Sequence, residues 1–200
     1  LFILLVVSIS GCESTGKAFK FFDDVDHPTV SNFDTSHGST DFSKVDDLQN
    51  VNGLTLANEQ GNIEFPATHT INVEGQDYDS YVTIGNGFIS VDSDNLDHSF
   101  NAPAQVTLSG VDCSNYIIAY GDDTYSSDSD ILAEGNTCDE RSNPSCSVIS
   151  CIGGDLTFEV SHFTGFAISS ATPVTDCMTI DTPGVYVLQN NISTTGTCFN

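Results

Sequence analysis

The chain has 200 residues, and its four Lys or Arg residues stand against 28 Asp or Glu residues, which gives a formal net charge of −24. This balance argues against nucleic-acid binding, which needs a basic footprint, and against attachment to anionic lipid through basic patches. Hydrophobic residues make up 38% of the chain, enough for a folded core, and the abundance of Gly, Ser, Thr, Asn and Asp favours short strands and turns.

The first nine residues, LFILLVVSI, form an apolar run that is too short to span a bilayer. Small residues follow it, so we interpret residues 1–11 as a secretory signal peptide. The alternatives are a buried strand or an uncleaved anchor helix. Ile9-Ser10-Gly11-Cys12 resembles a lipobox, which predicts lipidation of Cys12 and a membrane partner through that anchor. Stable anchoring takes more than one acyl chain.

Residues 12–39 are polar and acidic apart from one aromatic cluster, Phe19-Lys20-Phe21-Phe22. We expect them to form a tether between the membrane and the first folded domain. No convincing helical period appears anywhere in the mature chain.

Residues 40–170 show short alternating segments separated by Gly, Asn, Asp and Pro, which predict an antiparallel β-sandwich of the immunoglobulin-like type. The expected strands are residues 51–57, 61–65, 70–74, 81–84, 87–91, 105–108, 116–120, 147–151, 156–160 and 165–169. Single helical turns are expected near residues 46–48 and 96–100.

Residues 171–200 change the pattern, because very short alternating segments surround one Pro183-Gly184 turn. This is typical of the first coil of a right-handed parallel β-helix, and one coil cannot bury its own apolar face. The sequence also begins at Leu1 rather than Met. We therefore expect an amino-terminal fragment of a longer protein.

Seven cysteines are present, and six remain if Cys12 carries a lipid. An even number in an exported chain predicts three disulfides, for which 15 pairings exist. A zinc site is the alternative, but there is no CxxC pair and the spacings are irregular.

Candidate chemistry is sparse. Asp122, Asp123, Asp128 and Asp130 lie on a Ser-rich segment and are the candidate ligands for calcium, against the alternative of a solvated acidic loop. Asp92-Ser93-Asp94-Asn95-Leu96-Asp97 begins like an EF-hand loop but lacks the required Gly and Glu. Asn191-Ile192-Ser193 is an N-glycosylation sequon, with Asn191 as the acceptor.

No catalytic residue is predicted. The five histidines form no HxH or HExxH pair, and the GxSxG nucleophile elbow is absent. Glycan binding through exposed tyrosines is a further hypothesis, and its candidates are Tyr78, Tyr81, Tyr116, Tyr120 and Tyr125.

Several segments resemble a module of archaeal cell-surface proteins. They are residues 40–48, 54–56, 61–65, 84–91, 102–108 and 156–166. Residues 177–200 resemble the opening coil of pectate-lyase-like β-helix repeats. The resemblance implies surface display and no particular reaction. It also implies the disulfide pairs Cys113–Cys151, Cys138–Cys146 and Cys177–Cys198.

The favoured function is therefore an exported, membrane-anchored cell-surface protein with a structural or adhesive role, whose partner is a surface glycan or another surface protein. The alternative is the amino-terminal part of a carbohydrate-active β-helix enzyme, a polysaccharide lyase or hydrolase, whose active site would lie beyond residue 200. Calcium is the one candidate cofactor.

Overall fold

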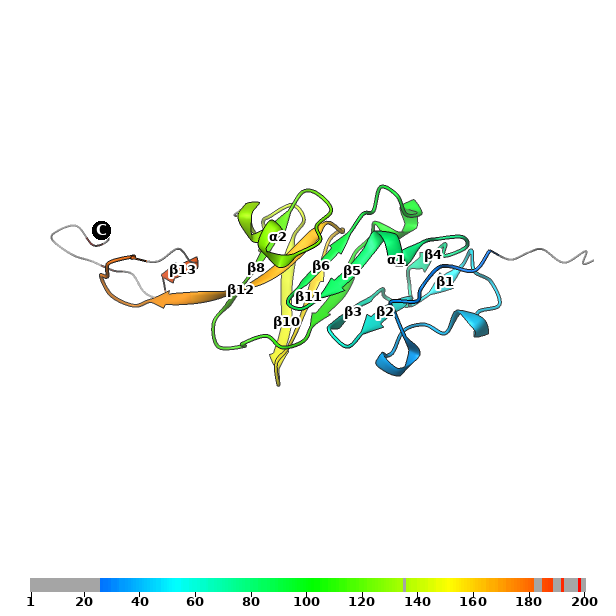
Figure 1. Ribbon diagram of the computed structural model, residues 1–200, viewed down its shortest axis with the longest axis horizontal. Helices are drawn as coiled ribbons and strands as arrows, with labels where there is room; N and C mark the ends of the chain where they lie inside the picture. The colour runs from blue at the N-terminus through cyan, green and yellow to red at the C-terminus, as the bar shows by residue number, and fades with distance from the viewer. Residues whose placement is uncertain (1–25, 135, 182–184, 189–191, 193–197, 199–200) are drawn as a thin grey trace, which may run out of the picture.

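A computed structural model describes residues 26–134, 136–181, 185–188, 192 and 198. In this part of the chain the protein is mostly β-structure, and its two larger sheets are built mainly from antiparallel strands (Figure 1). The all-β prediction is thus confirmed. The predicted signal peptide, Cys12 and Asn191 lie outside the described residues.

The first sheet has five strands in the order β10-β11-β7-β3-β2, and all of its pairs are antiparallel. Its strands alternate between the core and solvent, as β7 and β11 show by burying every second residue. The strands are β2 (Thr55–Asn58), β3 (Gly61–Glu64), β7 (Ala104–Leu108), β10 (Cys146–Ile152) and β11 (Asp155–Val160).

The second sheet has the order β5-β6-β12-β8-β9, with a sixth strand, β13, beside the far end of β12. Only the β12–β13 pair is parallel, and it runs from Ala171↔Val185 to Val174↔Leu188. The strands are β5 (Val82–Gly85), β6 (Phe88–Val91), β8 (Tyr116–Gly121), β9 (Asn136–Thr137), β12 (Gly165–Val174) and β13 (Val185–Leu188).

The remaining elements are short. A two-stranded ribbon pairs β1 (Val51–Asn52) with β4 (Thr70–Ile71). The helices are α1 (Tyr78–Tyr81), α2 (Asp128–Glu134) and the 3₁₀ turns η1 (Thr35–His37), η2 (Phe42–Lys44) and η3 (His98–Phe100). An Asp side chain accepts backbone N–H bonds at the start of each 3₁₀ turn and of α1, which explains where these turns begin.

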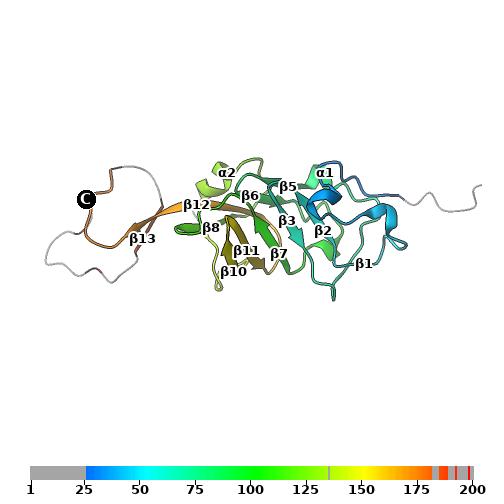
Figure 2. The same ribbon diagram turned by 90° about the horizontal axis from the view of Figure 1, so that it is seen from below.

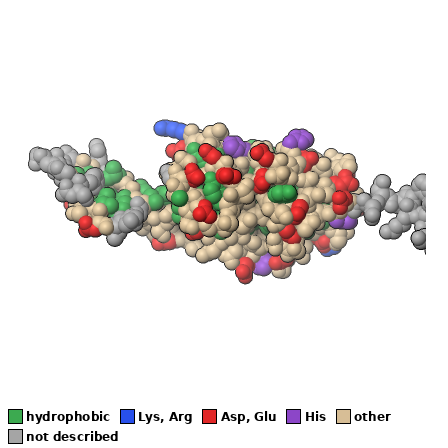
Figure 3. Space-filling model, turned by 45° about the horizontal axis from the view of Figure 1, so that its top comes forward, with side chains coloured by type: hydrophobic (Ala, Val, Ile, Leu, Met, Phe, Trp, Pro, Cys, Tyr) green, Lys and Arg blue, Asp and Glu red, His purple; other side chains and the backbone are tan. Residues whose placement is uncertain are grey.

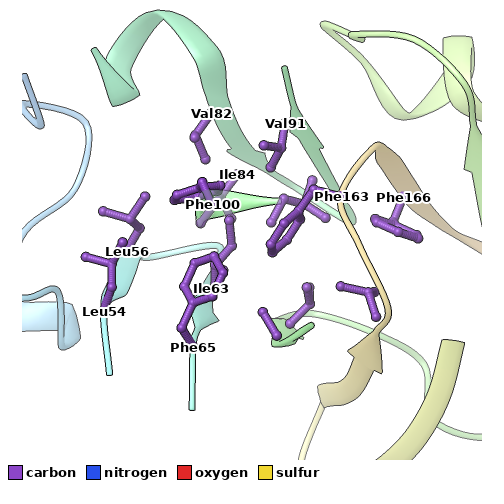
Figure 4. Packing of buried hydrophobic residues seen from close by; sticks show 14 of the residues in the cluster. Leu54, Leu56, Ile63, Phe65, Val82, Ile84, Val91, Phe100, Phe163 and Phe166 are labelled. Carbon is purple, nitrogen blue, oxygen red and sulfur yellow. The ribbon is translucent and has the colours of Figure 1, made fainter. Parts of the chain in front are cut away.

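Both sheets contribute to one hydrophobic cluster. Leu56, Ile63 and Phe158 come from the first sheet, whereas Ile89 and Phe166 come from the second, and all five are fully buried. Figure 4 shows side chains of this cluster directed toward one another from strands of both sheets. A smaller cluster holds α2 on the second sheet through Ile131.

The amino-terminal boundary of the domain differs from the prediction. Residues 29–39, expected in the tether, pack on the domain: Phe33 is buried, and Thr29 N–H donates to the Gln76 carbonyl. Buried Ser39 donates to the Ala57 carbonyl and accepts from the Ala57 N–H. One buried aromatic side chain and hydrogen bonds to residues 18 to 47 positions later in the sequence fix this polar segment, and composition does not reveal such long-range contacts.

Two other boundaries and one helix also differ from the prediction. The expected strand 51–57 is divided at Gly53, which adopts φ +65°. Helix α2 was not predicted, because Ile131 is the only buried residue among its seven, so its apolar residues show no helical periodicity. The domain limit set at residue 170 falls inside β12, which continues to Val174 and leads out of the body of the molecule toward β13 (Figure 2).

Candidate functional site

Three disulfides brace the described chain. They join Cys113 to Cys151, Cys138 to Cys146 and Cys177 to Cys198, with Cα atoms 5.5, 5.5 and 4.7 Å apart. These are the pairs that the resemblance implied. All six of these cysteines are paired in disulfides, so none of them supplies a thiolate to zinc.

The three disulfides indicate an extracellular or otherwise oxidising environment, because such bonds form and persist there and are rare in the reducing cytosol. Two of them end on the same strand, since Cys146 and Cys151 are both in β10. Within the described residues, no helix is long and apolar enough to cross a membrane.

An acidic hollow of about 480 Å³ lies between the loop after β6 and the loop after β8. Asp92, Asp94, Asp122 and Asp123 are among the residues that line it, together with polar and apolar neighbours that include Asn143 and His162. Acidic side chains are also spread widely over the face seen in Figure 3. The sequence shows the two Asp clusters separately, and only the fold brings them to one place.

The predicted calcium ligands do not gather. Asp122 and Asp123 line the acidic hollow, whereas Asp128 and Asp130 are in the first turn of α2. There, Asp130 accepts a hydrogen bond from Ser127 Oγ at 2.7 Å, and Asp128 accepts one from the Ser129 N–H. In the described part of the chain, no group of three or more His, Cys, Asp or Glu side chains could hold a metal ion. Within the described residues the structure therefore does not group these four Asp side chains as one metal site, because Asp128 and Asp130 belong to α2 and Asp122 and Asp123 line the hollow.

A second concavity, of about 350 Å³, lies on the outer face of the first sheet. A polar row crosses this face, because Glu64 lies opposite Gln105, which lies opposite Glu159, which lies opposite Ser147. Phe65, Pro66, Pro103 and Val160 are among its apolar lining residues. Sequence reasoning missed this row, although alternation places each of its members on the solvent face of its strand. Only the cross-strand register could have aligned them.

The histidines are dispersed over the described surface. His69 Nε2 lies 2.8 Å from the Ser99 carbonyl, His162 Nε2 lies 3.0 Å from Asn143 Oδ1, and His37 Nδ1 lies 2.8 Å from Asp34. His27 and His98 are exposed. Each is on a different loop or turn, so these side chains form no shared catalytic or metal-binding constellation.

The candidate tyrosines do not form an open platform for a sugar. Tyr78 is fully buried, and its desolvation raises the pKa of the phenol strongly, with a smaller contribution from Asp97. The other four are half-buried and pack against the two hydrophobic clusters: Tyr81, Tyr116, Tyr120 and Tyr125. The tyrosines thus serve mainly the core.

Among the described residues, the carboxylates of Asp34, Asp41 and Asp97 have a lowered pKa, and Asp34 and Asp97 illustrate the local causes. The hydrogen bond from Ser36 and then that from His37 lower the pKa of Asp34 to about 2. At Asp97, desolvation opposes ionisation, but hydrogen bonds from the side chain and backbone of Ser99 and from Asn72 lower the pKa. Both carboxylates cap 3₁₀ turns, so these shifts reflect local structure and do not mark a catalytic acid or base.

No protein-family model matches the chain, and no curated protein matches it either.

Proposed function

We propose that this chain is part of an exported cell-surface protein in which the described domain is a rigid, non-catalytic structural or adhesive stalk module. The observation that carries the proposal is the position of the two ends. The start of the described chain, drawn in dark blue, lies toward one end of an elongated body, and β13 lies at the opposite end (Figures 1 and 2). Because the polypeptide enters the domain at one end and leaves it at the other, the domain would separate a membrane anchor from the segment that follows β13.

We infer that the two large sheets face each other as a β-sandwich. Phe158 of β11 and Phe166 of β12 meet edge to face with ring centroids 6.1 Å apart, and they belong to different sheets. Core residues of both sheets form one cluster, as the inner faces of a sandwich would. Disulfides then hold the loops of this module in place against proteolysis and shear.

We further propose that β12 and β13 begin a parallel β-helix. Their parallel pairing supports this, because stacked coils of such a helix place successive strands side by side in the same direction. The Cys177–Cys198 disulfide encloses β13 and would fix the first coil. A carbohydrate-active enzyme on further coils is the alternative that the full-length sequence would decide.

Export through residues 1–11 and lipidation of Cys12 complete the proposal, and the oxidising environment that the disulfides require supports export. The surface charge fits the same setting, since residues 48–170 hold 18 acidic residues against Arg141 alone, a net charge of −17. A charge of this size keeps a module soluble and separate from its neighbours.

The test is surface display of the chain, with its native amino terminus, in an exporting host. We expect whole cells to lose the domain on protease treatment, the purified chain to contain no free thiol in the six paired cysteines, and the mature amino-terminal peptide to carry lipid. Cys12→Ser should release the folded chain into the medium.

A matched control is Ser10→Ala, which keeps a small residue near the expected cleavage site and leaves Cys12 in place. Protection of the domain from protease in intact cells, together with free thiols at Cys113 and Cys151, would refute the surface assignment. Release of the parent chain and the Cys12→Ser variant to the same extent would refute the lipid anchor alone.

A further inference from the structure

Strand β10 (Cys146–Ile152) forms an outer edge of the first sheet, with β11 on one side and none of the described strands on the other. Among the described residues, the one backbone hydrogen bond that β10 makes outside its ladder with β11 runs from the Cys146 N–H to the Asp139 carbonyl, at 2.8 Å. The edge from Ser147 to Ile152 therefore presents backbone groups that a further strand could bind.

This edge is also apolar. Val148 is 49% exposed, Ile149 is 51% exposed and Ile152 is 76% exposed. The other large hydrophobic residues exposed in the described chain, Ile180 and Leu188, lie beyond β12. Ile149 has no partner in β11, because the pairing passes from Val148↔Phe158 to Ser150↔Thr157. A bulge thus presents this side chain at the edge.

Natural edge strands are usually protected by charged residues, proline, a β-bulge or a covering loop. Strand β10 has a bulge, but the bulge leaves Ile149 half exposed. Residues 146–152 contain neither a charge nor a proline, although the chain as a whole has a net charge of −24. An uncharged strand with three exposed aliphatic side chains on so acidic a protein is typical of a protein-binding surface.

The strand is also held in place before any partner arrives. Cys146 is bonded to Cys138, and Cys151 is bonded to Cys113. Two disulfides on a seven-residue strand restrict its conformations, so that pairing with a partner would lose little conformational entropy.

The charges at the two ends of β10 determine what kind of strand fits. Asp139, Glu140 and Arg141 precede the strand, Glu159 lies opposite Ser147 near the same end, and Asp155 lies opposite Ile152 at the other end. In a second copy of this chain, antiparallel pairing would bring the net negative loop of one copy beside Asp155 of the other. A partner with Lys or Arg at its ends would instead place opposite charges together.

We propose that the β10 edge binds an extended segment of another protein by strand addition, and that this segment has an uncharged β-branched centre flanked by Lys or Arg. The backbone of the added strand supplies hydrogen bonds, its aliphatic side chains cover Val148, Ile149 and Ile152, and its ends meet the acidic residues. This interaction goes beyond the stalk role and does not depend on where the chain is anchored.

The test uses the purified, oxidised 200-residue chain and three synthetic peptides in fluorescence anisotropy titrations at low ionic strength. The first peptide is Lys-Lys-Val-Thr-Ile-Thr-Val-Lys-Lys. The second replaces its four Lys with Glu, and the third replaces its two Thr with Pro. We expect binding of the first, at least about tenfold weaker binding of the second, and no binding of the third. Equal binding of the first and third peptides would show attraction by charge alone and would overturn the proposal.

Ile149→Asp separates the two explanations further. It adds negative charge, so it would strengthen a merely electrostatic attraction of the Lys-flanked peptide, whereas it should weaken strand addition at least about tenfold because a carboxylate would be buried at the contact. Leu188→Asp is the matched control, since Leu188 is an exposed aliphatic residue away from β10, and it should leave binding unchanged.

Far-ultraviolet circular dichroism of both variants checks that they are folded. Stronger or unchanged binding in folded Ile149→Asp would overturn the proposal. So would dimerisation of the parent chain in sedimentation equilibrium that Ile149→Asp abolishes, because β10 would then bind a second copy.

Discussion

Phe158 and Phe166 form the aromatic contact that joins the two large sheets: the rings lie edge to face, at an interplanar angle of 68°. Neither side chain is exposed to solvent. They are only eight residues apart in the sequence, but β11 and β12 belong to different sheets, so a short connection links one sheet to the other. This pair is the natural place to test how far the domain depends on contact between its sheets.

Phe158→Ala should lower the free energy of unfolding by about 3–5 kcal/mol, because it removes a buried ring and leaves a cavity between the sheets. Guanidinium unfolding of the oxidised protein measures the loss. Ile152→Ala is the control, and it should change stability by less than about 0.5 kcal/mol since Ile152 is largely exposed. Similar losses in both variants would contradict the shared core.

Gly165→Ala should lower the free energy of unfolding by about 1–3 kcal/mol, because a Cβ at Gly165 would overlap the Tyr125 ring. Tyr125→Ala removes most of the obstacle, so the same glycine substitution should be less destabilising in that background. A double-mutant cycle by urea unfolding measures this coupling. Additive losses would show that Tyr125 is not what excludes a side chain there.

Removal of the disulfides should destabilise the domain according to the loops they close. The chain-entropy relation gives about 4 kcal/mol for the 38-residue separation of Cys113–Cys151 and about 2.5 kcal/mol for the 8-residue separation of Cys138–Cys146. Paired Cys→Ala substitutions and guanidinium unfolding compare the two. A larger loss from the shorter loop would show that local packing, rather than loop closure, dominates.

The pKa of Asp34 should be about 2 in the folded protein, compared with the ordinary value of 3.8, because Ser36 and His37 donate hydrogen bonds to its carboxylate. Since the folded pKa is depressed, this group's contribution to stability is present above pH 4 and is lost as the pH falls from about 4 to 2. Ser36→Ala removes the strongest cause and should raise the pKa.

Titration of the Asp34 carboxyl carbon by NMR measures this pKa directly. Ser43→Ala is a suitable control, because Ser43 bonds to the carboxylate of Asp41 in the next 3₁₀ turn and should leave the titration of Asp34 unchanged. An Asp34 pKa that is the same in the parent chain and in Ser36→Ala would contradict the hydrogen-bonding explanation.

Alternation along the sequence was sufficient to predict most of the strands. Residues 61–65, 105–108 and 156–160 alternate between apolar and polar side chains, and each coincides with an observed strand to within one residue. Such segments are predictable because the two-residue period of a strand appears in its own local composition. Helix α2 and the packed segment around Phe33 lacked any such period, so the sequence did not reveal them.

The sequence by itself indicated the class of this protein, because its acidic charge, its seven cysteines and its alternating segments separated by turn residues all follow from residue types and their spacing. Only the tertiary structure decided which acidic residues line the same hollow, and it placed Asp128 and Asp130 in α2, apart from that hollow. It also decided that the aliphatic side chains of β10 are exposed at the edge of a sheet. These features depend on strand order and register, which are set by contacts between residues far apart in the sequence.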